Sequence, residues 1–409
     1  METLTIESDK KCGSKLRAKL TIGLFGFGVV GEGLYHVLKN SRTVDATIKK
    51  VCIKHPEKER NVAENFYTVD ANDIINDDEI NLVVELIDNA DEAYQIVKSS
   101  LLKGKSVVSG NKKMLAEHLP ELIEIQRTHN VSLLYDASAC GSIPVIRNLE
   151  EYYDNDLLKS ITGILNGSSN FILTKIFLEN GDYDTALKQA QDLGFAESNP
   201  AFDVEGYDSM FKLIIITLHA FGTLVKPEEI FNCGIPNLAP CDIQYAKEKG
   251  LKIKLVAQVK KITEESFTMY VMPKLVAPDD YIYSVENEYN GVIIEGEYYE
   301  KQFMFGKGAG AFPTASSVLS DITARAHSYK YEYKKHTFFT PPAYTTETEV
   351  QIYLRYRESL AFSHFDFENI TEKYSSREYS YVIGTIKLSS LQKIKNLLPK
   401  LDVFIAAID

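Results

Sequence analysis

Between about residue 20 and residue 135 the chain alternates short β-rich runs with longer stretches of helical periodicity. The runs are LTIGLFG, TIKKVCI, LVVELI, SVVSG and VSLLY, and segments such as GEGLYHVLKN and DEAYQIVKSSLLKG carry apolar residues at helical spacing. This alternation favours right-handed βαβ units, hence a parallel sheet. We therefore predict an α/β fold with a Rossmann-type parallel-sheet domain over residues 15–142. The Gly-rich turn and helix pattern in residues 306–340 are expected to return the chain to this domain and complete it.

The rest of the chain has a different pattern. Residues 143–305 mix a helix candidate that is apolar nearly all round, SMFKLIIITLHAF, with the strand-like runs KLVAQVKK, FTMYVMPKLV and NGVIIEGEYY. We predict an α+β domain for substrate binding and dimerisation here. Residues 345–409, rich in Tyr, Lys and Glu, are predicted to form a small separate C-terminal unit.

A glycine-rich segment directly follows the first strand run and opens a helix. It reads Gly26-Phe27-Gly28-Val29-Val30-Gly31, in the context that a dinucleotide-binding loop requires. Its glycines would make the tight turn, admit a pyrophosphate and let helix and strand pack closely. The alternative is a sharp turn that binds no ligand, but the βαβ setting favours a nucleotide.

The end of the second strand run bears on the choice of nucleotide. An acid at this position holds the ribose hydroxyls of NAD, whereas a basic residue accepts the 2′-phosphate of NADP. Here the strand leads into Lys54, so we predict NADP, with NAD possible. An ordinary solvated loop remains an alternative, because Glu57 and Glu59 alternate with the bases.

Two lysines are candidates for the chemistry. Lys112 follows the strand run SVVSG and Asn111, and ligands of such sheets bind beyond the carboxyl ends of strands. Lys212 lies four residues after Asp208, hence on one face of a helix that continues as LIIITLHAF. Charges on a buried helix are costly unless they face a polar cavity or partners, which favours a cleft over a solvated pair.

Bulk properties exclude several classes of protein. The formal net charge of −12 disfavours binding to nucleic acid or to anionic membranes. No apolar run approaches a signal peptide or a membrane span, so we expect a cytoplasmic protein. Its five cysteines lack metal-type spacing and are expected to be reduced thiols.

Four blocks resemble homoserine dehydrogenases in sequence and in order. They are the Asn111-Lys112 motif, ILNGSSNFIL from Ile164, LGFAESNPAFDVEGYDSMFK from Leu193, and GAGAFPTASS from Gly308. The resemblance spans about residues 20 to 330. It implies NAD(P)-dependent interconversion of homoserine and aspartate semialdehyde in threonine and methionine biosynthesis, by a homodimer or higher homo-oligomer.

The resemblance also implies roles for individual residues. Lys112 and Lys212 would be catalytic, and the nicotinamide dinucleotide would contact the glycine loop, Lys54, Asn111, Lys112 and Gly310. The amino-acid substrate would be bound by Glu197, Asp203, Asp208, Asn166, Gly167 and Ser168. A monovalent cation such as sodium would be held near Asp136, Ala139, Gly141 and Ile143.

This sequence departs from the family pattern at three places. Asp136 stands where the family has Glu, Asp88-Asn89 replaces Gly-Gly after the third strand, and Asn199 replaces an Asp before Pro200. None of these changes removes a residue assigned to the chemistry.

Two other functions are alternatives to this interpretation. A phosphorylating aldehyde dehydrogenase would need a thiol nucleophile, for which Cys140 is the candidate. A nucleotide-sensing protein without enzymatic activity would have no need for both Lys112 and Lys212.

The C-terminal runs EVQIYLRYR, YSYVIGTIKL and VFIAAI, with the helix candidate SLQKIKNLL, predict a β-α-β-β-α-β unit. Many homoserine dehydrogenases carry an ACT-type regulatory domain at this end. Such domains usually have a glycine after the first strand, where this chain has residues 358–366 without one. We therefore predict a degenerate ACT-like tail that packs on the body or on a partner subunit, with little inhibition by threonine.

Overall fold

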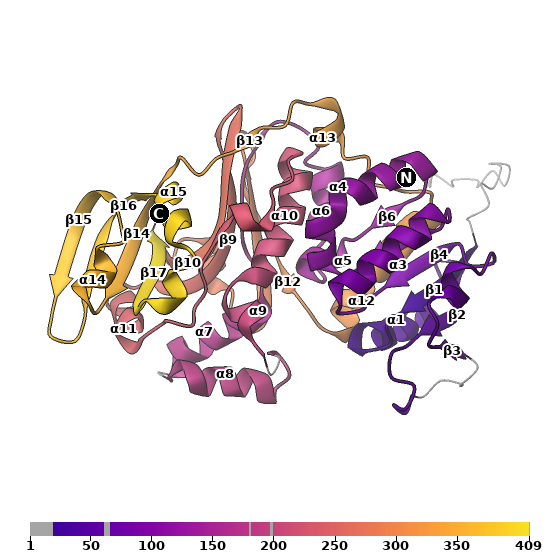
Figure 1. Ribbon diagram of the computed structural model, residues 1–409, viewed down its shortest axis with the longest axis horizontal. Helices are drawn as coiled ribbons and strands as arrows, with labels where there is room; N and C mark the ends of the chain where they lie inside the picture. The colour runs from indigo at the N-terminus through magenta and orange to yellow at the C-terminus, as the bar shows by residue number, and fades with distance from the viewer. Residues whose placement is uncertain (1–18, 61–65, 180, 197–198, 409) are drawn as a thin grey trace, which may run out of the picture.

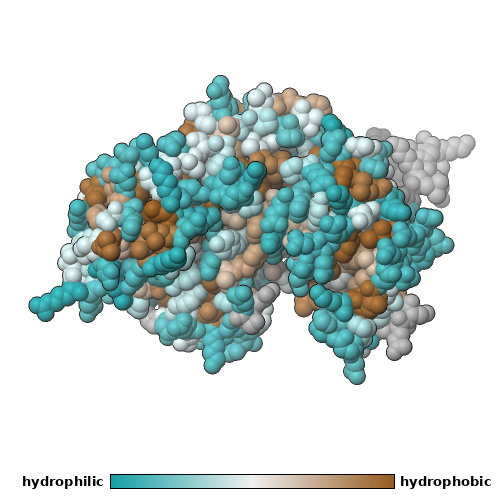
Figure 2. Space-filling view, in the orientation of Figure 1, coloured by the Kyte–Doolittle hydropathy of each residue, from teal (hydrophilic) through white to brown (hydrophobic). Residues whose placement is uncertain are grey.

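The computed structural model describes residues 19–60, 66–179, 181–196 and 199–408. Its strands form two sheets, one parallel and one mixed, which lie side by side along the long axis of the molecule (Figure 1). In the space-filling view the outline is notched between the part that carries α8 (Tyr183–Asp192) and the part that carries α1 (Val29–Asn40) (Figure 2). No helix in the described ranges is long and apolar enough to cross a membrane.

The first sheet has the strand order β3-β2-β1-β4-β5-β6, and every neighbouring pair is parallel. Its strands are β1 (Leu20–Phe25), β2 (Ala46–Cys52), β3 (Tyr67–Thr68), β4 (Leu82–Glu85), β5 (Ser106–Ser109) and β6 (Leu133–Leu134). The strand order reverses between β1 and β4, which is where doubly wound sheets bind nucleotides, beyond the carboxyl ends of the strands. The predicted parallel Rossmann-type sheet is confirmed.

Helices cover this sheet and include a segment from late in the chain. They are α1, α2 (Asn72–Ile75), α3 (Ala90–Leu102), α4 (Lys112–His129), α5 (Ala137–Cys140), α6 (Val145–Glu151) and α12 (Ala311–Ala326), whereas the later α13 (Lys334–Phe338) packs on α10 (Tyr207–Phe221). Helix α12 packs so closely on α1 that a Cβ on Gly33 would lie 2.6 Å from the Ala311 carbonyl oxygen. The chain thus returns to the first sheet after strands β7 (Leu158–Ile164) to β12 (Glu300–Lys307) of the second sheet, and it supplies β13 (Ala343–Tyr344) to β17 (Val403–Ile408) to the second sheet afterwards. The exact domain limits stay predictions.

The second sheet has the main strand order β12-β11-β7-β9-β10-β17-β14-β16-β15, and β8 and β13 also pair with β10. Its strands are β7 (Leu158–Ile164), β8 (Phe231–Asn232), β9 (Lys252–Thr263), β10 (Ser266–Val276), β11 (Tyr289–Gly296), β12 (Glu300–Lys307), β13 (Ala343–Tyr344), β14 (Glu349–Tyr356), β15 (Phe367–Ser375), β16 (Ser380–Lys387) and β17 (Val403–Ile408). The α-helices of this part are α7 (Gly167–Glu179), α8, α9 (Ala201–Val204), α10 (Tyr207–Phe221), α11 (Pro240–Glu248), α14 (Ser359–Phe362) and α15 (Leu388–Ile394). The 3-10 turns in the described residues of this part are η2 (Pro227–Glu229), η3 (Tyr281–Ser284) and η4 (Leu398–Lys400).

Helix α10 is the buried helix that the sequence predicted. Every residue from Asp208 to Phe221 is buried, including the charged side chains of Asp208 and Lys212. The helix packs against α4 and α6 on one side and against β9 on another (Figure 1). Because it lies between the two sheets, its first turn is carried to the boundary between them.

The C-terminal segment folds in the predicted order β14-α14-β15-β16-α15-β17, but it is not separate from the rest. Strand β17 pairs with β10, so one continuous sheet joins this unit to the preceding region (Figure 1). The guanidinium of Arg355, which is 1% exposed, contacts the carboxylates of Asp242 and Asp402 and the carbonyl oxygen of Asn237. The tail therefore packs on the body, and its ACT-like character stays a prediction.

Candidate active site

The three loop glycines have different reasons to be glycine. Gly26 has φ +91°, and a Cβ on it would lie 2.6 Å from the Leu86 carbonyl oxygen. A Cβ on Gly31 would lie 2.2 Å from the Gly26 carbonyl oxygen. At Gly28, in contrast, no described atom lies within 4 Å of that position. The fold requires the first and third glycines, whereas the second leaves room for a ligand.

A cavity of about 700 Å³ opens at this loop. It is lined by every residue from Gly26 to Gly31 and by Lys54, for which cofactor contact stays a prediction, and by the segment 86–89 after β4. No described side chain caps α1, which leaves the first backbone N–H groups of the helix for a phosphate. The residues present therefore fit a nicotinamide dinucleotide.

The rim of this cavity at the end of β2 is basic. Lys54 is 72% exposed, with its Nζ 3.6 Å from Glu92 Oε1. Lys58 and Arg60 also line the cavity, and Arg60 is held by hydrogen bonds to the carbonyl oxygens of His55 and Lys58, both 2.9 Å. From the sequence we predict only Lys54 as a contact, although the run KHPEKER also contains Lys58 and Arg60.

Asn111 and Gly310 lie outside the lining of the cavity. Asn111 caps α4 through Met114 N and donates its Nδ2 to the Ile87 carbonyl oxygen, 3.0 Å away, so it supports the loop that forms the cavity wall. Gly310 precedes α12 with φ +125°. Direct cofactor contact by these two residues stays a prediction.

Glu85 is a supporting residue that the sequence analysis missed. Its buried carboxylate accepts hydrogen bonds from Ile87 N (2.8 Å) and Ser109 Oγ (2.6 Å), linking the ends of β4 and β5. Burial raises the pKa of this carboxyl to about 7. An acid inside the apolar run LVVELI was the available signal.

A cluster of charged side chains lies where the two sheets meet. Asp208 in the first turn of α10 pairs through Oδ1 with Lys112 Nζ (2.9 Å) and through Oδ2 with Lys212 Nζ (2.7 Å). Lys112 comes from the start of α4, immediately beyond β5 of the first sheet. The two lysines proposed from separate sequence blocks thus share one buried carboxylate.

A polar bridge adds the second acid to this cluster. Asn166 donates its Nδ2 to Asp203 Oδ1 (2.7 Å) and to Asp208 Oδ2 (2.9 Å). Asn166 is itself fixed, because its side-chain oxygen accepts from Ser169 N (2.8 Å). Hydrogen bonds and ion pairs therefore hold the side chains of the cluster together in the absence of substrate.

The two acids have opposite electrostatic shifts. Burial would raise the pKa of Asp208, but the ammonium groups of Lys112 and Lys212 outweigh it and hold that pKa well below its usual range. Burial raises the pKa of Asp203, and the charge of Asp208 raises it further. Asp208 is thus held in its ionised form by the two lysines. Asp203 is the carboxylate that an additional cation would stabilise.

Lys212 has a second partner that sequence patterns could not supply. Its Nζ donates to the Leu165 carbonyl oxygen at 2.7 Å, and Asn290 Nδ2 donates to the same oxygen at 3.0 Å. Lys112 instead lies over the Phe202 ring, 5.6 Å from its centroid. Both contacts restrict where the two ammonium groups can move.

The remaining substrate predictions have mixed outcomes. Gly167 opens α7 close to β11, because a Cβ there would lie 2.5 Å from the Glu288 carbonyl oxygen. The Ser168 hydroxyl is bonded to the Phe195 carbonyl oxygen. Glu197 lies outside the described residues.

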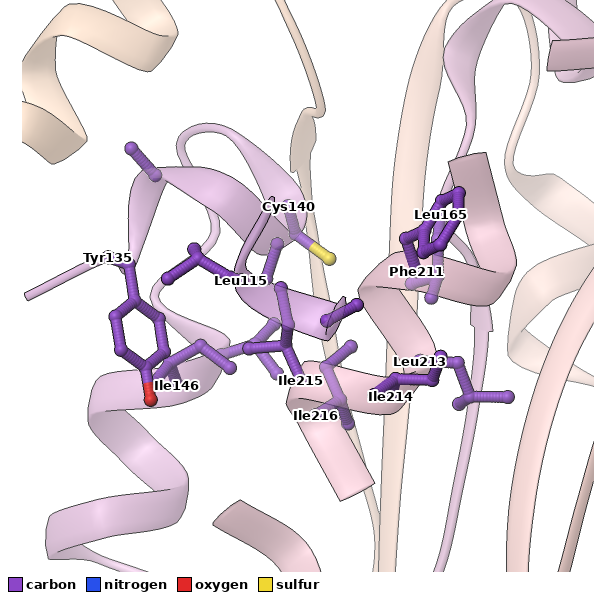
Figure 3. Close-up of a cluster of buried hydrophobic side chains, with 14 of the residues drawn as sticks. Leu115, Tyr135, Cys140, Ile146, Leu165, Phe211, Leu213, Ile214, Ile215 and Ile216 are labelled. Carbon is purple, nitrogen blue, oxygen red and sulfur yellow. The ribbon is translucent and has the colours of Figure 1, made fainter. Parts of the chain in front are cut away.

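Cys140 is a core residue. It is fully buried, and Figure 3 shows its side chain within a group of apolar residues that includes Leu115 and Ile215. Burial raises the pKa of its thiol to about 12, which disfavours the thiolate that a nucleophile requires. A small side chain suits this position better than a catalytic one does.

The predicted cation loop is tightly packed. Asp136 is buried and accepts from Arg147 N at 3.1 Å, while a Cβ on Gly141 would lie 2.4 Å from the Gly308 carbonyl oxygen. The Ile143 carbonyl oxygen accepts from Val145 N. No group of three or more acids, histidines or cysteines in the described chain could hold a metal ion. A monovalent cation held by backbone oxygens stays a prediction.

A parallel sheet with a glycine loop at its switch point, together with a lysine and carboxylate cluster shared between this part and a second domain, defines a nicotinamide-dinucleotide-dependent oxidoreductase. Comparison with family models gives the finer class. Residues 26–136 match "Homoserine dehydrogenase, NAD binding domain", and residues 144–323 match "Homoserine dehydrogenase". The chain belongs to the homoserine dehydrogenase family.

Individual relatives agree with this assignment. The homoserine dehydrogenase of Helicobacter pylori is 36% identical over 314 residues, which cover 75% of this chain and 74% of that protein. The Bacillus subtilis enzyme is 33% identical over 331 residues, 79% of this chain and 76% of that protein. The crystal structure of a homoserine dehydrogenase from Thiobacillus denitrificans, 27% identical, matches with a TM-score of 0.83 over 95% of this chain and 98% of the other.

The chain is therefore an NAD(P)-dependent oxidoreductase that interconverts homoserine and aspartate semialdehyde. Neither rival function is supported: the thiol chemistry would need the buried Cys140, and the relatives are enzymes rather than sensors.

Proposed function

We propose that Lys112 and Lys212 together perform the proton chemistry of this reaction, with Asp208 as their shared counterion. The observation that carries the proposal is the pairing of the two ammonium groups on opposite oxygens of one buried carboxylate. One lysine comes from each side of the domain boundary. A reaction between two bound molecules, the cofactor and the substrate, needs groups that are positioned in this way.

Each direction of the reaction uses the lysines differently. The nicotinamide, when bound, supplies the hydride chemistry at the carbonyl carbon. In reduction, a lysine ammonium stabilises the negative charge that develops on the aldehyde oxygen and donates a proton to it. In oxidation, a neutral lysine accepts the proton of the homoserine hydroxyl.

We assign substrate orientation to the acids of the cluster. Asp203 accepts a hydrogen bond from Asn166 Nδ2 through Oδ1, so its other oxygen remains available for the substrate ammonium group. Glu197, which the sequence resemblance adds to this set, is proposed for the same role.

We further propose that NADP is preferred over NAD. The basic rim formed by Lys54, Lys58 and Arg60 supports this, since a 2′-phosphate needs cations at the end of β2. An archaeal homoserine dehydrogenase in complex with NADPH matches this fold with a TM-score of 0.67 at 25% identity, over 77% of this chain and 99% of the other.

The assembly and location of the enzyme also stay proposals. Two exposed aromatic side chains support a homo-oligomer, Phe305 in the edge strand β12 and Tyr298 just before it. A cytoplasmic location and a monovalent cation rest on the sequence alone.

Alanine substitution of each lysine tests the proposal. Lys212→Ala should lower turnover by about two orders of magnitude or more, the range that general acid-base groups supply, with cofactor affinity little changed. Lys112→Ala should also impair turnover and raise the KM for homoserine. The measurement is homoserine-dependent NADP reduction by steady-state kinetics, with folding checked by circular dichroism. Near-normal turnover of folded Lys212→Ala would refute its catalytic role.

A further inference from the structure

Glu85 is the last residue of β4, and it lies between two strands whose ends lead into functional segments. In the sheet it pairs with Phe25 of β1 on one side and with Ser109 of β5 on the other. The segment 86–89, which lines the cofactor cavity, follows β4 directly, and α4, which begins with Lys112, follows β5. The side chain of Glu85 is therefore placed between the cavity wall and the start of α4.

Hydrogen bonds form a closed ring through this carboxylate. Glu85 Oε1 accepts from Ile87 N (2.8 Å), and Oε2 accepts from Ser109 Oγ (2.6 Å). The Ser109 hydroxyl oxygen accepts in turn from Asn111 N (3.2 Å), and Asn111 Nδ2 donates to the Ile87 carbonyl oxygen (3.0 Å). The side-chain oxygen of Asn111 also caps the first turn of α4. The ring thus connects the cavity wall with the helix that begins at Lys112.

The ring needs an ionised carboxylate at Glu85. An ionised carboxylate offers two acceptor oxygens, one for each of its donors. Protonation turns one of these oxygens into a donor that faces either Ile87 N–H or the Ser109 hydroxyl, so one contact of the ring is weakened. The protonation state of Glu85 therefore determines how firmly the two segments are held.

The surroundings of Glu85 bring its titration close to neutral pH. The side chain is fully buried, and burial raises the pKa of the carboxyl to about 7, against the opposing hydrogen bonds from Ser109 and Ile87. The negative charge of Asp88, in the cavity wall, raises this pKa further. Phe25 on β1 and Ser109 on β5, which flank Glu85, carry no charge.

We propose that ionised Glu85 is a positioning residue of this enzyme, which holds the wall of the cofactor cavity and the start of α4 in the arrangement that binding and reaction require. Because it is buried, it acts through Ile87 and Asn111 and not by contact with substrate or cofactor. The alignment of Lys112 rests on the proposed role of that lysine in proton transfer, whereas the alignment of the cavity wall does not. Cofactor affinity and kcat/KM for homoserine therefore both fall as the pH drops through about 7.

Glu85→Gln tests the proposal, because the amide has nearly the same shape and cannot ionise. The dissociation constant of NADPH is measured without turnover, by fluorescence titration from about pH 5.5 to about pH 9. We expect the affinity of the wild type to fall by about tenfold across a transition near pH 7. Glu85→Gln should bind NADPH weakly at every pH and lack this transition. A transition that persists in Glu85→Gln, as one from the cofactor 2′-phosphate would, overturns the proposal.

The stability of the same variant separates positioning from a merely structural role. The pKa of Glu85 is raised in the folded protein, so its ionised form is a cost to stability that is complete above the folded pKa of about 7 and absent below the ordinary value of about 4.5. At about pH 8 the melting temperature of Glu85→Gln should therefore equal or exceed that of the wild type, although NADPH binds more weakly. A lower melting temperature together with equal loss of affinity at every pH would assign Glu85 a structural role only.

Two further variants should move the transition, and they carry the test if Glu85→Gln does not fold. Ser109→Ala removes a hydrogen bond to the ionised carboxylate, so the midpoint should rise by about half a pH unit or more. Asp88→Asn removes a negative charge and should lower the midpoint by a smaller amount. Glu117→Gln, an exposed change on α4 outside the ring, is the matched control and should titrate as the wild type does.

An unchanged midpoint in Ser109→Ala would show that another group titrates, and the proposal would fail. That failure is distinct from failure of the lysine assignment. Near-normal turnover of Lys112→Ala would refute the role of that lysine and leave the NADPH-binding profiles of the Glu85 and Ser109 variants as they are.

Discussion

The cofactor cavity and the lysine cluster differ in how far their charged side chains are exposed and paired. The cavity is lined by a glycine loop and by exposed basic side chains, of which Lys54 is 72% exposed. In the cluster, Asp208 is buried and both of its carboxylate oxygens are paired before any ligand binds. The cavity therefore presents exposed groups to its ligand, whereas the cluster is a network of side chains that are already paired with one another.

This difference determines what a substitution does. A change at the basic rim of the cavity or at Gly28 removes a contact with the ligand and leaves the folded protein nearly as stable as before. A change in the cluster leaves a buried charge without its partner, which destabilises the protein as well as the reaction.

Asp208→Asn should have the largest effect. It leaves Lys112 and Lys212 without their common counterion, and loss of one partner of a buried ion pair costs about 3–5 kcal/mol. We expect about 3 kcal/mol in the free energy of unfolding, since Lys112 is 35% exposed and water screens its charge. Urea denaturation measures this, and a loss below about 1 kcal/mol would contradict the description of a buried network. Asp203→Asn, which removes an acid that pairs with no lysine, is the matched control.

The effect of Asp208 should depend on pH. Its pKa is lowered in the folded protein, so its stabilising contribution is present above the ordinary carboxyl pKa of about 3.9 and is lost as the pH falls through the folded value. The difference in unfolding free energy between the wild type and Asp208→Asn should therefore be full near neutral pH and shrink in acid.

The same substitution at two glycines should separate folding from binding. Gly31→Ser brings a Cβ against the Gly26 carbonyl oxygen and should cost about 3 kcal/mol of stability. Gly28→Ser meets no described atom, and serine is well tolerated at the start of a helix, so stability should change by less than about 0.5 kcal/mol. Its affinity for NADP should nevertheless fall by about tenfold, because the side chain occupies the space for the pyrophosphate. Unchanged affinity would show that Gly28 does not face the cofactor.

Charge reversal at the rim should change preference rather than activity. Lys54→Glu should lower the ratio of specificity constants for NADP over NAD by about tenfold, because an acid repels the 2′-phosphate and accepts the ribose hydroxyls. Lys39→Glu, an exposed change at the far end of α1 and outside the cavity lining, is the control. An unchanged ratio in Lys54→Glu would shift the assignment to Lys58 or Arg60.

The smallest effect is expected at Cys140. Cys140→Ser places a hydroxyl in a buried apolar site, so stability should fall by about 1 kcal/mol while turnover stays close to that of the wild type. Loss of turnover in a folded Cys140→Ser protein would reopen the thiol mechanism.

Much of the fold followed from local patterns. Strand runs, the buried helix α10 and the glycine loop each have a periodicity or a spacing that short sequence segments carry on their own. Local patterns did not predict that the C-terminal strands join the second sheet, because the pairing of β17 with β10 joins residues more than a hundred positions apart. The sequence of neither strand specifies with which other strand it pairs.

The candidate site divides in the same way. By itself the sequence determined which residue types are present: two lysines, three acids and an asparagine in blocks typical of one family. Only the tertiary structure decided that Lys112 and Lys212 share Asp208, that Leu165 and Asn290 fix the second lysine, and that Glu85 links the ends of β4 and β5. The physical reason is that a motif specifies chemistry along the chain, whereas burial and hydrogen-bond partners depend on which distant segments pack together.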